Sequence, residues 1–558
     1  MFSPELEDGQ IAYFTMEIGI ENGMNSYSGG LGVLAGDTIK TFADLDIPAV
    51  GVTQLNKRGY CHQELDGEGN QIDEPEPWDP EQFLEKLPVK TSVRINGDEV
   101  KVSAWKKEVQ GYKDSSVPVI FLDTDIEENE KKYRDITNSL YKSSDYKYRL
   151  YQEIVLGIGG ARILDEMGYE IGKYHMNESH SSLLTLELLN NFEGDREEVR
   201  EKCVFTTHTP VKAGHDEFSY DIVEEVMGDD YLPVSELKEL SKEESLHMTL
   251  LAMNLSSYIN AVSKRHEDVT KSVFSDHSID SITNGIHIPT WVSDSFEELY
   301  DDNFPGWRKD PYKLKHCVEV PGEDIWNSHL KEKEKLIEEV NDVSDVDMNS
   351  RVFTIGFARR AAPYKRADLI FHNKERLIDI SQEVGDFQII FAGKAHPQAG
   401  ASKDMIRSVY DHMEDVRNDI KITYIEDYDM KWGDLLTSGV DLWLNNPKRG
   451  REACGTSGMK AACNGVPQLS TLDGWWIEGH LEDVTGWEIG GDVDKDSDED
   501  IDRLDSSDIY KSLEEGILPK FYTNRKGWTR VMKNAIAFNA SYFNTHRMVR
   551  EYILNAYS

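Results

Sequence analysis

The sequence is poor in cysteine and contains no closely spaced cysteine pair. No two of its cysteines form a C-x-x-C motif; they stand at Cys61, Cys203, Cys317, Cys454 and Cys463. Zinc sites and disulfide frameworks depend on such pairs or on dense, regular spacing. The chain therefore predicts neither a disulfide-stapled fold nor a bound metal.

Positive charge is also scarce. Lysine and arginine total 61 against 103 aspartates and glutamates, which gives a formal net charge of −42. Such a surface repels nucleic-acid phosphates and anionic membranes, so we expect neither as a partner. The excess of carboxylates favours adaptation to a concentrated-salt, halophilic cytosol, where screening removes the self-repulsion. The alternative is an ordinary acidic protein.

Long hydrophobic runs are lacking as well. No apolar stretch approaches the roughly 20 residues that a membrane-spanning helix needs. The first residues, MFSPELEDGQ, have neither the basic nor the apolar region of a secretion signal. We therefore expect a cytoplasmic protein.

Apolar residues are nevertheless sufficient for large folded cores. The chain has 558 residues, of which 39% are hydrophobic, and this length suggests roughly two to four domains. A charged stretch at 326–346 precedes the strand pattern RVFTIGFAR and indicates a boundary. We expect an N-terminal domain over 1–340, a C-terminal domain over 341–540 and a helix over 541–558 that crosses back to the first domain.

Strand and helix patterns alternate in both domains, which indicates an α/β fold. In the first, AYFTMEI, AVGVTQL and CVFTTHT predict strands, and 244–274 predicts one long helix. In the second, RVFTIGFAR, FQIIFAGKA, KITYI and VDLWLNN alternate with helical segments. This order is typical of a parallel sheet with helices on both faces, whose ligands bind at the carboxyl ends of the strands.

Two glycine-rich stretches predict different structures. YSGGLGVLAGD at 27–37 places Gly29, Gly30 and Gly32 before a helical pattern, which suits a nest of backbone N–H groups facing an anion. A simple tight turn is an equal alternative. LGIGGAR at 156–162 follows a helical pattern, so it predicts close helix packing and not a dinucleotide loop.

Basic residues gather in FARRAAPYKRADL, after a predicted strand. Arginine offers a bidentate fork to phosphate oxygens and lysine a mobile charge, so Arg360 and Lys365 could bracket a phosphate. A solvated basic face is the ordinary alternative, weakened by the scarcity of bases in this chain. His208 in FTTHTP also follows a strand and could bind a polar ligand, although a lone histidine is more commonly structural.

Lys460 lies among small residues in EACGTSGMKAACNG, after the strand VDLWLNN. Thr456 or Ser457 is expected at the N-cap of the helix that follows. A buried lysine without a partner is costly, while its small neighbours leave room for a flat aromatic group and a desolvated amine suits Schiff-base formation. The stretch predicts a reactive lysine beside a phosphate site.

Together with YHMNESHSSL, TNGIHIPTW, IIFAGKAHP and LDGWWIEG, these motifs resemble the glycogen, starch and maltodextrin phosphorylases, the pyridoxal-phosphate-dependent α-glucan phosphorylases. They cover nearly the whole chain, which resembles a short form without the N-terminal regulatory extension of the animal muscle enzymes. The resemblance implies a GT-B fold, with two Rossmann-like domains facing each other across a catalytic cleft. A homodimer is one assembly that it allows.

The resemblance also implies a glycosyltransferase reaction. Inorganic phosphate would cleave an α-1,4-glucan, glycogen or maltodextrin, from its non-reducing end and release α-glucose 1-phosphate with retention. Lys460 would carry pyridoxal 5′-phosphate as a Schiff base, and the 5′-phosphate of this cofactor would act as the proton shuttle.

Further roles are implied residue by residue. Arg360 would bind the substrate phosphate, and Lys365 would bridge the substrate and cofactor phosphates. The other implied contacts are Thr456 and Tyr428 with the cofactor phosphate; Gly30 and Leu31 with the substrate phosphate, Gly30 also lying near the cofactor; Glu452, Cys454 and Gly455 with the sugar 3- and 4-hydroxyls; and Asn284 and His208 with the 6-hydroxyl. The His208 carbonyl would face the developing oxocarbenium ion, and Glu178 and His180 would support this shell.

Departures and rivals remain. Cys454 stands where the better-known enzymes have serine, and a thiol is a poorer hydrogen-bond donor. GTSG also replaces GTGN.

Two rival functions are considered. One is a nucleotide-sugar-dependent GT-B glucan synthase, which would share Arg360, Lys365 and Glu452 but has no use for Lys460. The other is a catalytically idle glucan-binding protein.

Overall fold

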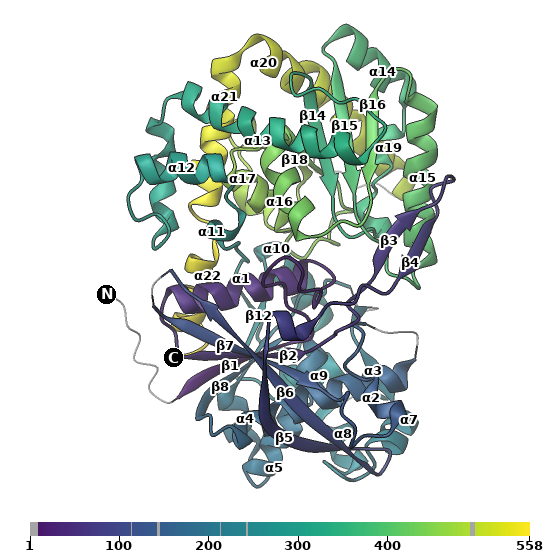
Figure 1. The fold of residues 1–558 in the computed structure, drawn as a ribbon, viewed down its shortest axis with the longest axis vertical. Helices are drawn as coiled ribbons and strands as arrows, with labels where there is room; N and C mark the ends of the chain where they lie inside the picture. Colours follow the sequence, from purple (N-terminus) through teal and green to yellow (C-terminus); the bar gives the residue numbers. More distant parts are fainter. Residues whose placement is uncertain (1–8, 113, 142–144, 212–213, 242–243, 491–496) are drawn as a thin grey trace. The chain divides into compact units, whose positions relative to one another are not determined.

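The computed structural model describes residues 9–112, 114–141, 145–211, 214–241, 244–490 and 497–558. Internal contacts divide the chain into two compact units (Figure 1). Unit 1 comprises the described residues of Met1–Tyr60, Pro75–Thr283 and Thr545–Ser558, and unit 2 comprises those of Cys61–Glu74 and Asn284–Asn544.

Unit 1 is built on a mostly parallel sheet with the strand order β13-β12-β9-β8-β1-β2-β7-β6-β5. The strands from β13 to β7 pair in parallel, and β6 pairs antiparallel with both β7 and β5. The bounds are β1 (Gln10–Thr15), β2 (Ala49–Gln54), β5 (Glu85–Ile95), β6 (Asp98–Gln110), β7 (Ser116–Asp123), β8 (Ile171–Asn177), β9 (Cys203–Thr206), β12 (Tyr258–Ala261) and β13 (Asp280–Ser281), with a separate antiparallel pair of β10 (Glu217–Ser219) and β11 (Ser245–His247).

Helices cover both faces of this sheet. Ala12 and Phe14 of β1 belong to one apolar core, and Ile11 and Tyr13 to another, because successive side chains of a strand point to opposite faces. A strand buried on both faces is apolar throughout, as in the central strands of α/β proteins. The helices of unit 1 are α1 (Gly30–Asp44), α2 (Lys131–Arg134), α3 (Tyr146–Ile154), α4 (Gly160–Glu166), α5 (Leu184–Asn191), α6 (Arg196–Lys202), α7 (Tyr220–Val226), α8 (Val234–Ser241), α9 (Met248–Asn254), α10 (Lys264–Val273) and α22 (Thr545–Asn555).

Unit 2 holds a fully parallel sheet with the order β16-β15-β14-β17-β18-β19. Its strands are β14 (Phe353–Ala358), β15 (Phe387–Ala392), β16 (Lys421–Ile425), β17 (Leu442–Asn445), β18 (Gln468–Thr471) and β19 (Gly486–Ile489). Its helices are α11 (Ile288–Trp291), α12 (Asp294–Asn303), α13 (Gly322–Val343), α14 (Lys374–Glu383), α15 (Gly400–Val416), α16 (Met430–Gly439), α17 (Ser457–Cys463), α18 (Trp476–Gly479), α19 (Asp498–Lys511), α20 (Leu518–Thr523) and α21 (Arg525–Asn534). Both units confirm the α/β prediction.

The hairpin of β3 (His62–Leu65) and β4 (Gln71–Glu74) interrupts the sequence of unit 1 but belongs to unit 2. Asp73 pairs with Lys403 of α15, beside which the hairpin lies in Figure 1. Gln63 Nε2 donates to the Gly393 carbonyl at 2.9 Å. Nothing in the sequence pattern predicts this exchange.

The division between the units differs from the predicted 340/341 boundary, because the contacts change over between Thr283 and Asn284. The charged stretch before residue 341 is not a linker but the amphipathic helix α13. Its residues Ile325, Leu336 and Val340 are buried in unit 2, and charged residues such as Glu334 and Glu338 lie on the exposed face. At the other end of the chain, α22 packs on α1 in unit 1, where Thr545 Oγ1 lies 2.5 Å from Thr41 Oγ1 (Figure 1).

The single helix predicted over 244–274 is wrong. The described part of this segment forms β11, α9, β12 and α10. Tyr258–Ala261 becomes strand β12 because it pairs with β9, more than 50 residues earlier in the chain, and such a non-local pairing overrides local helix propensity.

The close helix packing predicted for LGIGGAR is confirmed, since a Cβ at Gly160 would lie 2.7 Å from the Phe14 ring. Among the described residues, every helix is too short or too polar to cross a membrane.

A buried ion pair ties α13 to the sheet of unit 2. Asp441 accepts hydrogen bonds from Lys333 and, at 2.8 Å, from the Thr354 amide, while His329 Nε2 lies 2.8 Å from its other oxygen. The Lys333 and Asp441 side chains are fully buried. Burial alone would raise the pKa of Asp441, but Lys333 and His329 outweigh it and lower that pKa.

We expect Asp441→Asn to destabilise unit 2 by about 3 to 5 kcal/mol, because it leaves the Lys333 charge buried without a counter-charge. Urea unfolding measures this loss, with Asp342→Asn at an exposed position as the control. Because the folded pKa of Asp441 is depressed, its contribution is present above the unfolded pKa, about 3.9, and is lost as the pH falls below it. A variant as stable as wild type at pH 7 would contradict the role of the pair.

Candidate active site

The predicted site residues of unit 1 lie at the carboxyl ends of neighbouring parallel strands. The segment leading to the glycine loop follows β1, Glu178 follows β8, and His208 lies two residues beyond β9. These strands adjoin in the order β9-β8-β1. This is the edge at which parallel sheets bind ligands, so unit 1 brings the glycine loop and His208 to one edge.

Helix α1 begins at Gly30, with Gly29 as its N-cap. The Val33 amide donates to the Gly29 carbonyl at 3.2 Å, so the N–H groups of Gly30, Leu31 and Gly32 precede the first intrahelical bond. Within the described part of the chain, a Cβ at Gly29 or Gly30 would meet no atom within 4 Å. The N-terminus of α1 is thus exposed at Gly30, the arrangement expected of an anion site.

Glu178 organises the backbone around His208. Its carboxylate accepts hydrogen bonds from the amides of Ser179 at 2.8 Å and His208 at 2.6 Å, and from the Thr209 hydroxyl at 2.9 Å. Burial would raise the pKa of Glu178, but nearby histidines outweigh it and lower that pKa to about 2. Glu178 is therefore ionised at neutral pH and fixes the course of the chain at His208.

The His208 imidazole is neutral at physiological pH. Burial lowers its pKa to about 4, although the Glu178 charge acts in the opposite direction. Its Nε2 lies 2.6 Å from Oδ1 of Asn177, and an amide oxygen only accepts, so Nε2 carries the proton. A neutral imidazole in a fixed orientation can form a hydrogen bond with a hydroxyl group, but it carries no positive charge that would attract phosphate.

A charged cluster beside His180 escaped the sequence analysis. Arg149 Nη2 donates to Asp216 at 2.9 Å, and His180 Nε2 lies 3.7 Å from the same oxygen. Burial and the Asp216 charge raise the pKa of Glu153 well above its usual value, whereas Arg149 and His180 outweigh burial and lower the pKa of Asp216 to about 2. Asp216 lies eight residues after His208, in the segment FTTHTPVKAGHDEF at 205–218, and this proximity was the available signal. Arg149 had none.

In unit 2, Lys460 lies on the short helix α17, whose N-cap is Thr456 as predicted. The Thr456 hydroxyl does not cap the helix. The Lys460 side chain is buried, and its Nζ lies 3.4 Å from the centroid of the Trp291 ring. A cation over an aromatic face is stabilised by the ring quadrupole, which answers how this amine is accommodated. Sequence reasoning missed Trp291, although it closes the motif TNGIHIPTW.

Tyr428 and Asp434 extend this cluster. A Cβ at Gly433 would lie 3.1 Å from the Tyr428 hydroxyl and 3.8 Å from the Trp291 ring, so the two aromatic side chains adjoin. Burial and the charges of neighbouring carboxylates raise the pKa of Asp434 to about 6, while Lys460 acts in the opposite direction. Asp434 Oδ1 is buried and finds no hydrogen-bond donor among the described residues.

The four bases of FARRAAPYKRADL have different surroundings. Arg359 is buried against the Phe357 ring and donates to the Leu444 carbonyl. Arg366 bonds Asp502 and Asp505, each at 2.7 Å. Both side chains are thus engaged within the fold.

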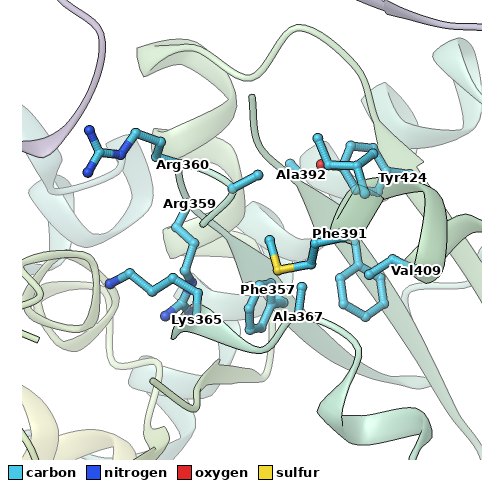
Figure 2. Close-up of a pocket in the computed structure, with 12 residues that line it drawn as sticks. Phe357, Arg359, Arg360, Lys365, Ala367, Phe391, Ala392, Val409 and Tyr424 are labelled. Carbon is cyan, nitrogen blue, oxygen red and sulfur yellow. The ribbon is translucent and has the colours of Figure 1, made fainter. Parts of the chain in front are cut away.

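Figure 2 shows the charged ends of Arg360 and Lys365 directed away from the apolar side chains of Phe357, Phe391 and Val409. The cavity among these apolar groups has a volume of about 10 Å³. That is room for about one water molecule and far too little for a sugar or a phosphate. The cavity is therefore a packing gap and not a ligand site.

Lys365 forms an ion pair with Glu452. The loop that carries Glu452 is held by Asp473, whose Oδ2 accepts from the amides of Arg451 at 3.1 Å and Glu452 at 2.9 Å. A Cβ at Gly455 would lie 3.3 Å from Glu452 Cδ. Unit 2 thus brings Lys365, Glu452 and Gly455 together on the loop that leads into α17. Sequence reasoning missed Asp473, which lies in the motif LDGWWIEG.

The remaining predicted residues are buried in unit 2: Cys454 in the same loop and Asn284 at the start of the unit. The residues present fit pyridoxal phosphate. An amine beside an aromatic ring suits its aldehyde and its own ring. Asp434 Oδ1 is a further polar position that the described residues leave without a hydrogen bond.

Comparisons with known proteins agree with these features. The sequence profile of the carbohydrate phosphorylase family matches residues 198–488. The chain is 38% identical to a maltodextrin phosphorylase of Thermococcus litoralis, over 98% of this chain and 70% of that protein. It is 35% identical to a glycogen phosphorylase of Aquifex aeolicus, over 98% and 86%. An uncharacterised protein of Methanocaldococcus jannaschii is 32% identical, over 98% and 99%.

Proposed function

Since the chain belongs to the carbohydrate phosphorylase family, we propose that it cleaves α-1,4-glucans by phosphorolysis. Inorganic phosphate attacks the non-reducing end, and α-glucose 1-phosphate leaves with retention of configuration. The observation that carries this proposal is the buried Lys460 amine over the Trp291 ring, in a chain similar to maltodextrin and glycogen phosphorylases.

In this proposal, Lys460 would hold pyridoxal phosphate beside the Trp291 ring, and Thr456, Tyr428 and Lys365 would contact the cofactor phosphate. When bound, the cofactor supplies a phosphate group that can exchange a proton with inorganic phosphate. The buried surroundings of Lys460 keep water from the covalent bond. Asp434 offers a carboxyl group close enough to Lys460 for the two charges to interact.

Arg360 and Lys365 hold the substrate phosphate between them. The guanidinium binds two oxygens in one plane, and the ion pair with Glu452 fixes the Lys365 amine. The amides of Gly30 and Leu31 supply further donors from unit 1. Two phosphates repel each other, so several cationic and N–H groups are needed to hold them close together.

The sugar is held by hydroxyl contacts. Glu452, Cys454 and Gly455 take the 3- and 4-hydroxyls, and Asn284 and neutral His208 take the 6-hydroxyl. The His208 carbonyl, whose backbone Glu178 fixes, faces the positive charge that develops at the anomeric carbon. The proposal requires the two units to act on one glucan and one phosphate, as two domains of a GT-B fold do across a cleft.

The function is tested by incubating the protein in molar potassium chloride with maltoheptaose and inorganic phosphate. We expect phosphate-dependent formation of glucose 1-phosphate and shortened maltodextrins. Glucan extension from a nucleotide sugar, without phosphate-dependent release, would instead identify the glucan synthase. Binding of maltoheptaose with no turnover under either condition would leave a glucan-binding protein.

We expect Asp473→Ala to lower kcat/KM of phosphorolysis about ten- to a hundredfold. The loop that carries Glu452 would lose two hydrogen bonds, and a shift of a substrate-binding group by about 1 Å can lower the rate about a hundredfold. Asp473→Asn keeps one acceptor and should lose less. The exposed Asp498, paired with Lys448, gives the control Asp498→Ala. A kcat/KM unchanged in Asp473→Ala would exclude a positioning role for this carboxylate.

A further inference from the structure

Glu17 is a buried carboxylate to which no role has yet been given. It lies two residues beyond β1, at the same edge of the sheet as Glu178 and His208, and its exposed fraction is 3%. A buried charge is costly unless several hydrogen bonds satisfy it. The hydrogen-bond donors around Glu17 therefore indicate its role.

The partners of Glu17 are the residues just before the glycine helix. Its Oε2 accepts from the amides of Ser28 at 2.6 Å and Gly29 at 3.1 Å, and the Ser28 hydroxyl lies 3.1 Å away. The Tyr141 hydroxyl donates to Oε1 at 2.9 Å. Both carboxylate oxygens are thus engaged, and the entry to α1 is bound to one rigid group.

Close packing fixes the loop from the other side. A Cβ at Gly32 would lie 2.8 Å from Glu17 Oε2 and 2.7 Å from the Tyr27 Cβ. The Gly19 amide donates to the Gly32 carbonyl at 2.8 Å. Glycine is therefore required at Gly32 because the carboxylate occupies the space that any side chain would take.

The division of the amides follows from these contacts. Glu17 takes the N–H groups of Ser28 and Gly29, whereas those of Gly30, Leu31 and Gly32 come before the first intrahelical bond, and Gly30 is exposed. Two adjacent sets of amides thus serve different acceptors. One set anchors the loop, and the other is left for the ligand.

Tyr141 connects this anchor to the second cluster of unit 1. It has a φ of 51°, which is uncommon for a bulky residue. Its ring lies 4.8 Å from the Arg149 guanidinium and 5.8 Å from the His180 ring. The glycine loop and the cluster of Arg149, His180 and Asp216 are therefore braced through one side chain.

We propose that Glu17 is a positioning residue that holds the glycine loop in the shape that binds the substrate phosphate. The inference rests on the proposed function, in which the amides of Gly30 and Leu31 meet that phosphate. Glu17 acts by geometry and not by attraction, because its own negative charge repels an anion at the same helix end. An uncharged acceptor of the same shape should therefore preserve the effect.

The first test compares phosphorolysis by Glu17→Ala and Glu17→Gln. We expect Glu17→Ala to raise the KM for inorganic phosphate about ten- to a hundredfold, with the KM for maltoheptaose changed less than about twofold. Glu17→Gln keeps an oxygen acceptor for the two amides and should raise the KM for phosphate less than about threefold. The exposed Glu21, which pairs with Lys107, gives the control Glu21→Gln.

A merely structural role predicts a different pattern. Glu17→Ala would then lower the melting temperature or the yield of folded enzyme while the KM for phosphate stays unchanged, and this result would overturn the proposal. Equal losses in Glu17→Ala and Glu17→Gln would also overturn it, because they would show that charge and not shape is required.

Hydrogen–deuterium exchange of the peptide over residues 26–34 tests the anchor without relying on catalysis. We expect Glu17→Ala to exchange at least about tenfold faster than wild type at Ser28 and Gly29, and inorganic phosphate to slow exchange of this peptide in wild type only. Exchange that is the same in both proteins would refute the anchor. Faster exchange in the variant, in a protein without phosphorolysis, would keep the anchor and reject the proposed function.

Discussion

Lys460→Ala is expected to abolish both the covalent attachment of pyridoxal phosphate and phosphorolysis. The Lys460 amine lies 3.4 Å from the centroid of the Trp291 ring, in a buried environment, and no other group is proposed to hold the cofactor aldehyde. The variant would lose the covalent anchor and, with the cofactor, the proton-transfer group, so we expect kcat to fall at least about 10⁴-fold. The measurement is the cofactor absorbance of the purified variant, followed by the rate of glucose 1-phosphate formation.

Two variants control for indirect effects of this change. Lys460→Arg keeps a cation over the Trp291 ring but cannot form the bond, so it should be equally inactive and better folded. Lys431→Ala removes an exposed lysine that pairs with Glu339 and should keep full activity and absorbance. A Lys460→Ala enzyme that retains full turnover would refute the assignment of this lysine.

Arg360→Ala is expected to raise the apparent KM for phosphate roughly ten- to a thousandfold, on the scale of losing a charge-assisted bidentate contact. Of the two adjacent arginines, Arg359 is engaged with the Leu444 carbonyl, whereas the Arg360 side chain points away from the apolar cavity (Figure 2). The KM for maltoheptaose should change little. Initial rates over a range of phosphate concentrations measure both constants.

Arg360→Lys provides the graded comparison, since lysine keeps the charge but loses the planar fork. We expect its KM for phosphate to fall between those of wild type and Arg360→Ala. Arg407→Ala, at an exposed position near Glu68, should match wild type. An unchanged phosphate dependence in Arg360→Ala would remove this residue from the site.

The parallel sheet of unit 2 could be predicted closely because its strands are short apolar runs bounded by turns. KITYI coincides with β16, and RVFTIGFAR contains β14. Such runs are buried on both faces and form strands wherever they pair. The segment 244–274 failed because β12 depends on pairing with β9, which no local pattern contains.

The residues proposed to contact ligands were easier to predict than those proposed to hold them in place. Lys460 was found because a charge among small residues conflicts with its surroundings, and His208 because it follows a strand. Trp291, Asp473 and Glu17 act through contacts between distant parts of the chain; Tyr141 reaches Glu17 across 124 positions. Each lies in or beside a recognised motif, but only the fold reveals its partner.

The most direct measurement of the central claim is borohydride reduction of the folded protein supplied with pyridoxal phosphate, followed by peptide mapping. If Lys460 anchors the cofactor, a pyridoxyl label appears on the peptide that contains GTSGMK, and the protein loses its cofactor absorbance on reduction. Folded protein that produces glucose 1-phosphate from maltoheptaose and phosphate without any label on Lys460 would contradict the claim.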